Sequence, residues 1–211
     1  MMDVLTAKNM MTHVAHKMVE SEPLLTKFDQ TIGDGDHGIG MERGFNAVAE
    51  LLESDYQPQD VSKLLLKIGS TMMATMGGAS GAIFGTLFRS GAKAIKGATV
   101  LDTSSLSTFL AAGLHAVYER GGAKPGDKTM IDALVAAVKE SEKHSGDLTE
   151  SLPAIVKAAH QGVEATKDMI ATTGKAKTLG ERSLGHPDPG AVSMALILEF
   201  MCEFATEQVA A

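Results

Sequence analysis

A short acidic segment near the N-terminus concentrates carboxylates and glycines. Within it, Asp29, Asp34 and Asp36 stand beside Gly33, Gly35 and Gly38. Carboxylate oxygens suit Mg²⁺, which takes one or two carboxylates from a protein and its other ligands from phosphate and water. The alternative is a solvated acidic turn, because Asp and Gly are favoured in turns. The spacing alone leaves both interpretations open, since short motifs of this kind match by chance.

Two familiar loop templates overlap this segment, and neither fits it. An EF-hand beginning at Asp34 would need an oxygen ligand and a glutamate at the positions where the chain has Gly38 and Phe45. The glycine spacing from Gly33 to Gly38 matches a dinucleotide fingerprint, but no strand–helix–strand pattern flanks it. We therefore exclude an EF-hand calcium loop and treat the fingerprint as accidental.

A second glycine-rich segment, residues 77–81, precedes an expected helix. Its backbone amides and the Ser80 hydroxyl could face a phosphate at the helix N-terminus. The alternative is a close crossing of two helices, which also requires small residues. Taken alone, the segment favours this alternative somewhat. The segment is not a nucleophile elbow, because Ala82 stands where that motif requires glycine.

The segment 121–129 resembles a Walker A loop and ends in Lys128 and Thr129. Asp127 is inserted before the lysine and no strand precedes the segment, so a P-loop fold is not supported. The segment could form a wall of a nucleotide pocket. The alternative is a simple stop and restart between two helices.

Positive charge gathers in the loop at residues 173–188, through Lys175, Lys177 and Arg182. A flexible basic loop that closes over phosphates is one interpretation, and an ordinary solvated loop is the other. His37 and His186 could orient ligand oxygens, although a lone histidine is more often a structural group. No residue in the chain is assigned as a nucleophile or general base.

The apolar periodicity predicts an all-α chain with little strand. Abundant Ala, Leu and Met and the absence of Trp agree with this prediction. Eight amphipathic helices are expected, at residues 6–20, 40–53, 60–76, 79–96, 105–120, 127–143, 153–172 and 189–209. In this scheme Asp60 and Asp127 are N-caps, and Pro153 stands in a first turn. Short connections favour antiparallel neighbours, with the glycine-rich segments at the helix junctions.

Length and composition limit the class of protein. A chain of 211 residues with 44% hydrophobic residues and no evident linker is expected to form a single domain, residues 1–211. The net charge of −7 argues against a nucleic-acid partner. Cys202 is the only cysteine, which excludes a disulfide framework and favours a reducing compartment. We find no signal peptide and no apolar window long enough for a membrane span, so a soluble, cytoplasmic protein is expected.

Four separated segments together resemble the L subunit family of dihydroxyacetone kinases. They are residues 33–38, 77–81, 124–130 and 179–183 with 188–190, and they follow the family's order across nearly the whole chain. The resemblance implies an antiparallel eight-helix barrel with a nucleotide pocket at one end. It also implies ADP or ATP and two Mg²⁺ ions as cofactors.

The same resemblance assigns the residues of the site. Asp29, Asp34 and Asp36 would hold the metal ions. His37, Ser80, Lys175 and Arg182 would position the phosphoryl group, and none is assigned with certainty as a catalytic residue. The nucleotide would contact His37, Gly38, Ile39, Gly40, Ala79, Ser80, Gly121, Thr129, Met130, Lys175, Asp188, Pro189 and Gly190.

Two departures from the family pattern concern contacts to the nucleotide. Gly40 stands where the family often has Asn or Thr. The family lid commonly reads Gly-Arg-Ala-Ser-Tyr-Leu-Gly-Glu-Arg, whereas this chain has Lys175 and Lys177 in that segment. Lysine retains the positive charge but lacks the planar fork with which arginine binds phosphate.

The resemblance implies transfer of a phosphoryl group to dihydroxyacetone held by a separate K-type subunit. ADP would stay bound and be rephosphorylated by a phosphohistidine-carrying M subunit of the phosphotransferase system. The first alternative is the L subunit of an ATP-dependent dihydroxyacetone or erythrulose kinase. The others are a non-catalytic nucleotide-binding regulatory or scaffold protein, and a helical interaction domain that binds no nucleotide.

Overall fold

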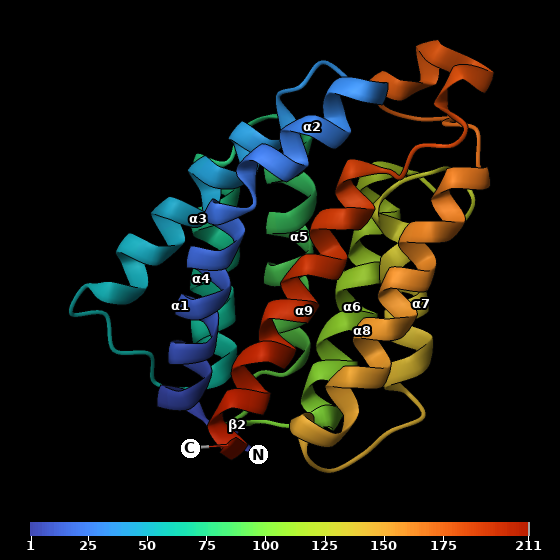
Figure 1. The fold of residues 1–211 in the computed structure, drawn as a ribbon. Coiled ribbons are helices and arrows are strands. Elements are labelled where there is room, and N and C mark those ends of the chain that lie inside the picture. The colour runs from blue at the N-terminus through green and yellow to red at the C-terminus, as the bar shows by residue number, and fades with distance from the viewer. Residues whose placement is uncertain (211) are drawn as a thin grey trace.

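Antiparallel helices arranged in a ring make up most of the computed structural model, which describes residues 1–210 (Figure 1). The α-helices of this part of the chain are α1 (Val4–Glu20), α2 (Glu22–Ile32), α3 (His37–Glu53), α4 (Val61–Thr75), α5 (Gly78–Ala94), α6 (Thr103–Gly121), α7 (Met130–Ser141), α8 (Leu148–Ala165) and α9 (Pro189–Ala210). The 3₁₀ helices η1 (Thr166–Asp168) and η2 (Lys175–Ser183) connect α8 to α9. A two-residue strand, β1 (Met2–Asp3), pairs antiparallel with β2 (Val100–Leu101).

Eight of these helices form the wall of a barrel. Each packs against the next in the order α1, α3, α4, α5, α6, α7, α8 and α9, and α9 closes the ring against α1. Neighbouring helices run in opposite directions, and α2 crosses the end of the barrel at which α1 stops and α3 starts (Figure 1). The expected all-α fold with antiparallel helices is confirmed.

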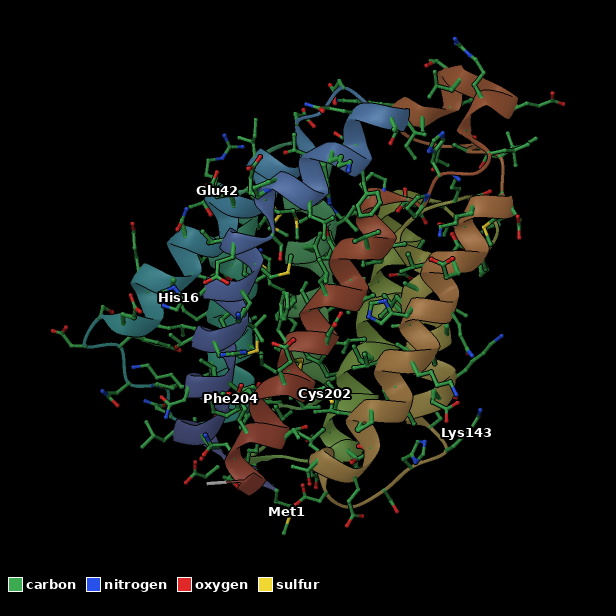
Figure 2. All side chains as sticks on the ribbon, in the orientation of Figure 1. Met1, His16, Glu42, Lys143, Cys202 and Phe204 are labelled. Carbon is green, nitrogen blue, oxygen red and sulfur yellow. The ribbon has the colours of Figure 1, made fainter. Side chains whose placement is uncertain are left out.

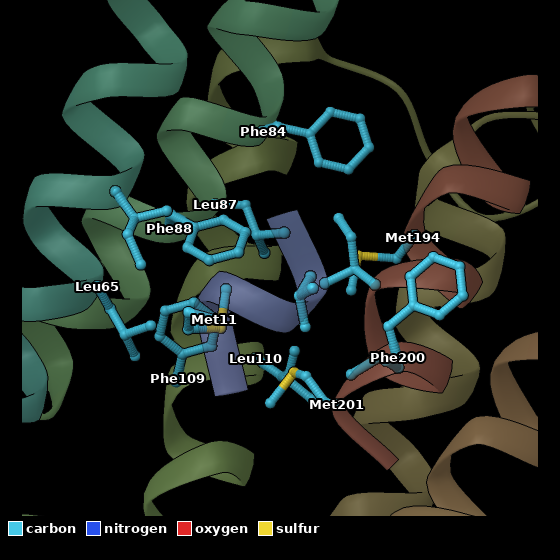
Figure 3. Close-up of a cluster of buried hydrophobic side chains, with 14 of the residues drawn as sticks. Met11, Leu65, Phe84, Leu87, Phe88, Phe109, Leu110, Met194, Phe200 and Met201 are labelled. Carbon is cyan, nitrogen blue, oxygen red and sulfur yellow. The ribbon is translucent and has the colours of Figure 1, made fainter. Parts of the chain in front are cut away.

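The interior of the barrel is filled by apolar side chains, as expected for amphipathic helices that turn one face inward. Figure 3 shows part of this core, in which α1, α4, α5, α6 and α9 contribute Met11, Leu65, Phe84, Leu87, Phe88, Phe109, Leu110, Met194 and Met201. The rings of Phe88 and Phe109 meet edge to face with centroids 5.4 Å apart. Exposed charged and polar side chains such as His16 and Lys143 lie on the outside (Figure 2).

The helix α2 was missed in the sequence, and it changes the place of one site residue. The helix predicted at residues 6–20 does end before Pro23, but Pro23 stands in the first turn of a second helix, α2, where proline is tolerated. Asp29 therefore lies on a helix, and the acidic loop comprises only residues 33–36.

The N-caps of α7 and α8 also differ from the prediction. Thr129, not Asp127, caps α7 in a capping box with Asp132, whose carboxylate accepts a hydrogen bond from the Thr129 amide at 2.8 Å. Asp147 caps α8, which therefore starts at Leu148 and contains Pro153 in its interior. The helix ends at Ala165 rather than at residue 172, because η1 and the following loop leave the barrel there.

The last helix, α9, is long and apolar enough to cross a membrane by length and composition, over Pro189–Gln208. The prediction concerned an uninterrupted apolar stretch, and Glu199, Glu203 and Glu207 interrupt this one. Most of that segment is buried inside the protein, where α9 packs against α1, α7 and α8. A place in the core of the barrel explains its apolar composition, and Cys202 on this helix is a partly buried free thiol.

Candidate functional site

Four helix N-termini meet at one end of the barrel. Because alternate helices of the ring run in the same direction, α3, α5, α7 and α9 all begin at this end (Figure 1). Their first residues, including His37, Gly78, Met130 and Pro189, line one cavity of about 470 Å³. Each N-terminus contributes free backbone N–H groups and a partial positive charge. The cavity is therefore suited to an anionic ligand such as a phosphate chain.

Three carboxylates lie together at the edge of this cavity. Asp29 comes from α2, and Asp34 and Asp36 come from the turn before α3; one oxygen of each lies within 4.8 Å of the others. The Asp29 carboxylate accepts a hydrogen bond from the His37 amide at 3.1 Å, which orients it towards the turn. A Cβ atom at Gly33 would collide with the Asp29 carboxylate, so this turn requires glycine. The oxygen donors fit one or more Mg²⁺ ions.

Lys175 brings a positive charge to these carboxylates from the segment that covers the cavity. We call residues 169–184 the lid. The Lys175 ammonium donates hydrogen bonds to Asp34 and to Asp36, the latter at 2.8 Å. The hydrogen bond from Lys175 lowers the pKa of Asp34, and its bonds to both carboxylates raise the pKa of Lys175. The cluster thus already holds a cation that the chain itself supplies.

His37 connects the starts of three helices. Its Nδ1 atom lies 3.1 Å from the Ser80 hydroxyl of α5, and its Nε2 atom lies 2.8 Å from the Ser193 hydroxyl of α9. Burial lowers the pKa of His37, although Asp29 and Asp36 act in the opposite direction. The imidazole is therefore neutral at neutral pH and can act as a hydrogen-bonding group rather than as a cation.

A buried lysine and a carboxyl group lie in the wall beside the lid. The Lys128 side chain donates hydrogen bonds to the carbonyl oxygens of Thr166 and His186, at 2.5 and 2.6 Å. The Asp188 carboxylate accepts a hydrogen bond from the Ala191 amide at 2.7 Å, as an N-cap of α9 does. Burial lowers the pKa of Lys128 and raises the pKa of Asp188 to about 7.

In Asp188→Asn, the free energy of unfolding is expected to fall less between pH 4 and pH 7 than in the wild type. Because folding raises the pKa of Asp188 from 3.8 to about 7, the folded state binds more protons than the unfolded state in this window. The free energy of unfolding therefore falls as the pH rises through it. Asparagine caps a helix equally well and does not titrate. Urea denaturation of both proteins across this range is the measurement, and equal slopes would contradict the raised pKa.

Comparison with known proteins identifies the family to which the chain belongs. Residues 31–203 match the family described as the DAK2 domain. The chain belongs to this family. It is 40% identical over 187 residues to the ADP-binding subunit DhaL of PEP-dependent dihydroxyacetone kinase 1 from Listeria innocua, covering 89% of each chain. It is also 40% identical over 192 residues to the DhaL subunit of Escherichia coli, covering 89% of this chain and 90% of that one.

A solved structure shares the DAK2 fold and has a nucleotide bound. The dihydroxyacetone kinase of C. freundii in complex with AMP-PNP and Mg²⁺ matches with a TM-score of 0.72 and 28% identity, over 93% of this chain and 33% of that one. Human triokinase/FMN cyclase is 37% identical over 193 residues, covering 90% of this chain and 33% of its own length. The chain thus spans about nine tenths of the separate DhaL subunits and a third of these longer kinases.

Most of the residues predicted to contact metal or nucleotide line the cavity of this DAK2 domain. They are Asp29, Asp34, Asp36, His37, Ile39, Gly40, Ala79, Ser80, Thr129, Met130, Lys175, Asp188, Pro189 and Gly190. Gly38, Gly121 and Arg182 are not among its lining residues. Gly38 is buried where α3 crosses α2, Gly121 ends α6, and Arg182 is exposed on η2.

Other residues line the cavity of the DAK2 domain without having been assigned as contacts, although Gly33, Gly77, Gly78 and Lys128 lie in segments that the sequence analysis singles out. They are Ile32, Gly33, Arg43, Met76, Gly77, Gly78, Ile83, Phe84, Lys128, Thr173, Gly174 and Ala176. The Arg43 guanidinium donates hydrogen bonds to the carbonyl oxygens of Thr75 and Met76, at 2.8 and 2.5 Å, at the end of α4. Helical periodicity could have indicated Arg43, because it follows Gly40 by three residues and so shares its face.

Gly38→Ala is expected to destabilise the DAK2 domain by about 1–3 kcal/mol through overpacking. The new Cβ would lie 2.6 Å from the Glu22 carbonyl oxygen and from the Thr26 amide nitrogen, so α2 would have to move. Gly40→Ala on the same helix is the control, because its Cβ would meet only the Met76 carbonyl oxygen within 4 Å, at 3.4 Å. Urea denaturation should show no destabilisation of the control, since alanine favours helix. Equal losses would contradict this account of Gly38.

Proposed function

We propose that this DAK2 domain is the nucleotide-binding subunit of a dihydroxyacetone kinase. It holds Mg²⁺ with ADP or ATP and transfers the terminal phosphoryl group to dihydroxyacetone on a separate K-type subunit. The observation that carries the proposal is the meeting of four helix N-termini with three clustered carboxylates at one cavity. Helix N-termini bind phosphates, and clustered carboxylates bind the Mg²⁺ ions that accompany phosphates.

The polar end of the cavity supplies the groups for the phosphates. Asp29, Asp34 and Asp36 would hold two Mg²⁺ ions, which when bound neutralise charge on the phosphate oxygens. The backbone amides at the start of α5 and the Ser80 hydroxyl face the same space. His37, neutral and held between two serines, would orient the Ser80 hydroxyl without repelling the cations.

The apolar lining of the cavity is suited to the nucleoside. Ile83, Phe84 and Met130 present apolar surface on which a purine ring can pack. Thr129 and residues 188–190 form the adjoining rim with hydroxyl and backbone groups. The phosphate chain would then extend from this lining towards the acidic cluster.

The phosphoryl end of the site is open to a partner protein. The side chains of Asp34 and Asp36 are 49% and 70% exposed even with Lys175 bound to them. No side chain of the site is positioned as a nucleophile, so the acceptor and its activation would come from the K-type subunit. The contribution of this chain would be positioning and electrostatic stabilisation.

The relatives favour a separate subunit that uses ADP as a retained cofactor. The Listeria innocua and Escherichia coli relatives are ADP-binding subunits of PEP-dependent kinases, and about nine tenths of each chain is matched. This supports residues 1–211 as a single domain that acts in the cytoplasm. A phosphohistidine-carrying M subunit would rephosphorylate the ADP.

Identifying the nucleotide in the purified protein tests this proposal. The protein is purified without added nucleotide and denatured, and released nucleotide and Mg²⁺ are quantified by chromatography and metal analysis. Near-stoichiometric ADP is the expected result. An empty protein that binds Mg²⁺ and ATP reversibly would indicate an ATP-dependent dihydroxyacetone or erythrulose kinase. Failure to bind either nucleotide with Mg²⁺ would refute the proposal and favour an interaction domain.

A further inference from the structure

Lys128 is a buried lysine in an unfavourable backbone conformation. Its φ angle is 60°, and among residues 1–210 it is the only non-glycine residue with a positive φ. Its exposure is 2%, and the proposed function gives it no task. A left-handed conformation is unfavourable for a residue with a Cβ atom and is retained only where surrounding contacts enforce it. The contacts of the side chain therefore indicate what Lys128 does.

The side chain of Lys128 joins the two ends of the lid. Its ammonium donates to the Thr166 carbonyl oxygen at 2.5 Å, just before the lid starts. It also donates to the His186 carbonyl oxygen at 2.6 Å, just after the lid ends. Between these points the lid lines the cavity with residues 173–176. Hydrogen bonds from a charged donor are stronger than those between neutral groups, so the two bonds from Lys128 are the strongest contacts that join the two ends of the lid.

Two further hydrogen bonds complete this junction. The Gly185 amide donates to the Lys167 carbonyl oxygen at 2.8 Å, and the Asp188 amide donates to the Thr166 hydroxyl at 2.9 Å. We call Thr166, Lys167, Gly185, His186 and Asp188 the lid base. These two bonds hold the two ends of the lid together. Lys128, which lies in the loop between α6 and α7, binds both ends to that loop.

The charge of Lys128 is directed into the protein rather than towards a ligand. Asp132, Asp168 and Asp188 all act on its ammonium as nearby negative charges. Both of its hydrogen bonds are made to backbone carbonyl oxygens of the lid base. The next two residues, Thr129 and Met130, line the nucleoside wall. One residue thus fixes the lid base relative to the wall on which the nucleotide would rest.

We propose that Lys128 is a positioning residue that clamps the lid base and thereby sets how slowly the nucleotide leaves the cavity. The inference rests on the proposed function, because it assumes a nucleotide beneath the lid. Opening the lid at its base would require breaking the two bonds from Lys128. Without them, the lid base keeps only the two hydrogen bonds between neutral groups, and the nearest charge-assisted contact is that of the Thr172 hydroxyl with Asp127 at 2.6 Å, inside the lid.

Lys128→Met tests the clamp, because methionine keeps much of the apolar stem and removes every donor. The measurement is the dissociation rate of fluorescent ADP with Mg²⁺ from the full chain, followed by stopped-flow chase with unlabelled ADP. Release is expected to be at least about tenfold faster than from the wild type. Lys8→Met is the matched control: Lys8 is 9% exposed and donates to the Tyr56 carbonyl oxygen at 2.7 Å at the other end of the barrel.

The control separates a clamp from a general loss of stability. Both variants lose a buried lysine–carbonyl contact, so thermal denaturation should show that both are destabilised, but only Lys128→Met should release ADP faster. Equal release rates for Lys128→Met and the wild type would overturn the clamp. So would equal acceleration in both variants, since that result would indicate loosening of the whole barrel.

Hydrogen exchange on the wild-type protein gives a test that does not depend on a folded variant. The amides of Gly185 and Asp188 are expected to exchange more slowly than that of Lys177 in the exposed part of the lid. Equally fast exchange would overturn the clamp. If the wild type binds no ADP, the proposed function fails, whereas the exchange measurement still decides whether the lid base is held closed.

Discussion

Asp34→Asn is expected to reduce phosphoryl transfer by at least about a hundredfold while the fold is retained. The amide removes one negative charge and presents an NH₂ group to the cations that the cluster would hold. The Asp34 side chain is 49% exposed, and Lys175 of the lid is the partner of its carboxylate in the structure. The helices of the barrel therefore do not depend on it. The measurement is the rate of transfer to dihydroxyacetone with the K-type subunit, beside circular dichroism of the variant.

Asp55→Asn is the matched control for this substitution. Asp55 is also an exposed aspartate, but it lies in the connection between α3 and α4 at the other end of the barrel. Transfer by this variant should equal that of the wild type. In Asp34→Asn, the Mg²⁺ concentration needed for half-maximal activity should also rise. Full activity of Asp34→Asn would refute the metal assignment, whereas nucleotide binding without transfer in the wild type would favour the regulatory or scaffold alternative.

Periodicity predicted the helices of the ring because each is amphipathic and can be recognised locally, whereas their closure into a barrel was implied by the family resemblance. It failed at α2, because no helix is predicted between residues 20 and 40 although Pro23 fits a first helical turn. It failed at the start of α8 because Pro153 was taken as a first-turn residue, whereas Asp147 supplies the cap. Both errors concern a proline, which can stand in the first turn of a helix or elsewhere, and only tertiary packing decides between these positions.

The acidic cluster and the glycine-rich helix junctions could be predicted for a related reason. In an antiparallel ring, alternate helices begin at the same end, so separated helix starts must come together there. Lys128 and Ser193 could not be found in this way, because their partners are backbone carbonyls or a side chain of a remote segment. No sequence pattern encodes those contacts.

Lys175→Met is expected to act in opposite directions on two ligands. The ammonium of Lys175 competes with Mg²⁺ for Asp34 and Asp36, so its removal should strengthen binding of Mg²⁺ alone to the nucleotide-free protein. The gain should be at most about fivefold, because water and salt weaken an exposed ion pair. With nucleotide bound, the same ammonium would be free to contact phosphate. Phosphoryl transfer should therefore fall by about tenfold or more, as for loss of a charged hydrogen bond.

Isothermal titration with Mg²⁺ and transfer kinetics test these two effects separately. Lys177→Met is the control, because Lys177 is an exposed lysine of the same lid and does not contact the carboxylates in the structure. It should change neither quantity. A loss of both Mg²⁺ binding and transfer in Lys175→Met would show that Lys175 supports the site structurally rather than occupying it. Tighter Mg²⁺ binding and slower transfer can occur together only if the Lys175 ammonium contacts the carboxylates when the site lacks Mg²⁺ and contacts the phosphates when Mg²⁺ and nucleotide are bound. Closure of the lid would then depend on the charge of the bound ligand.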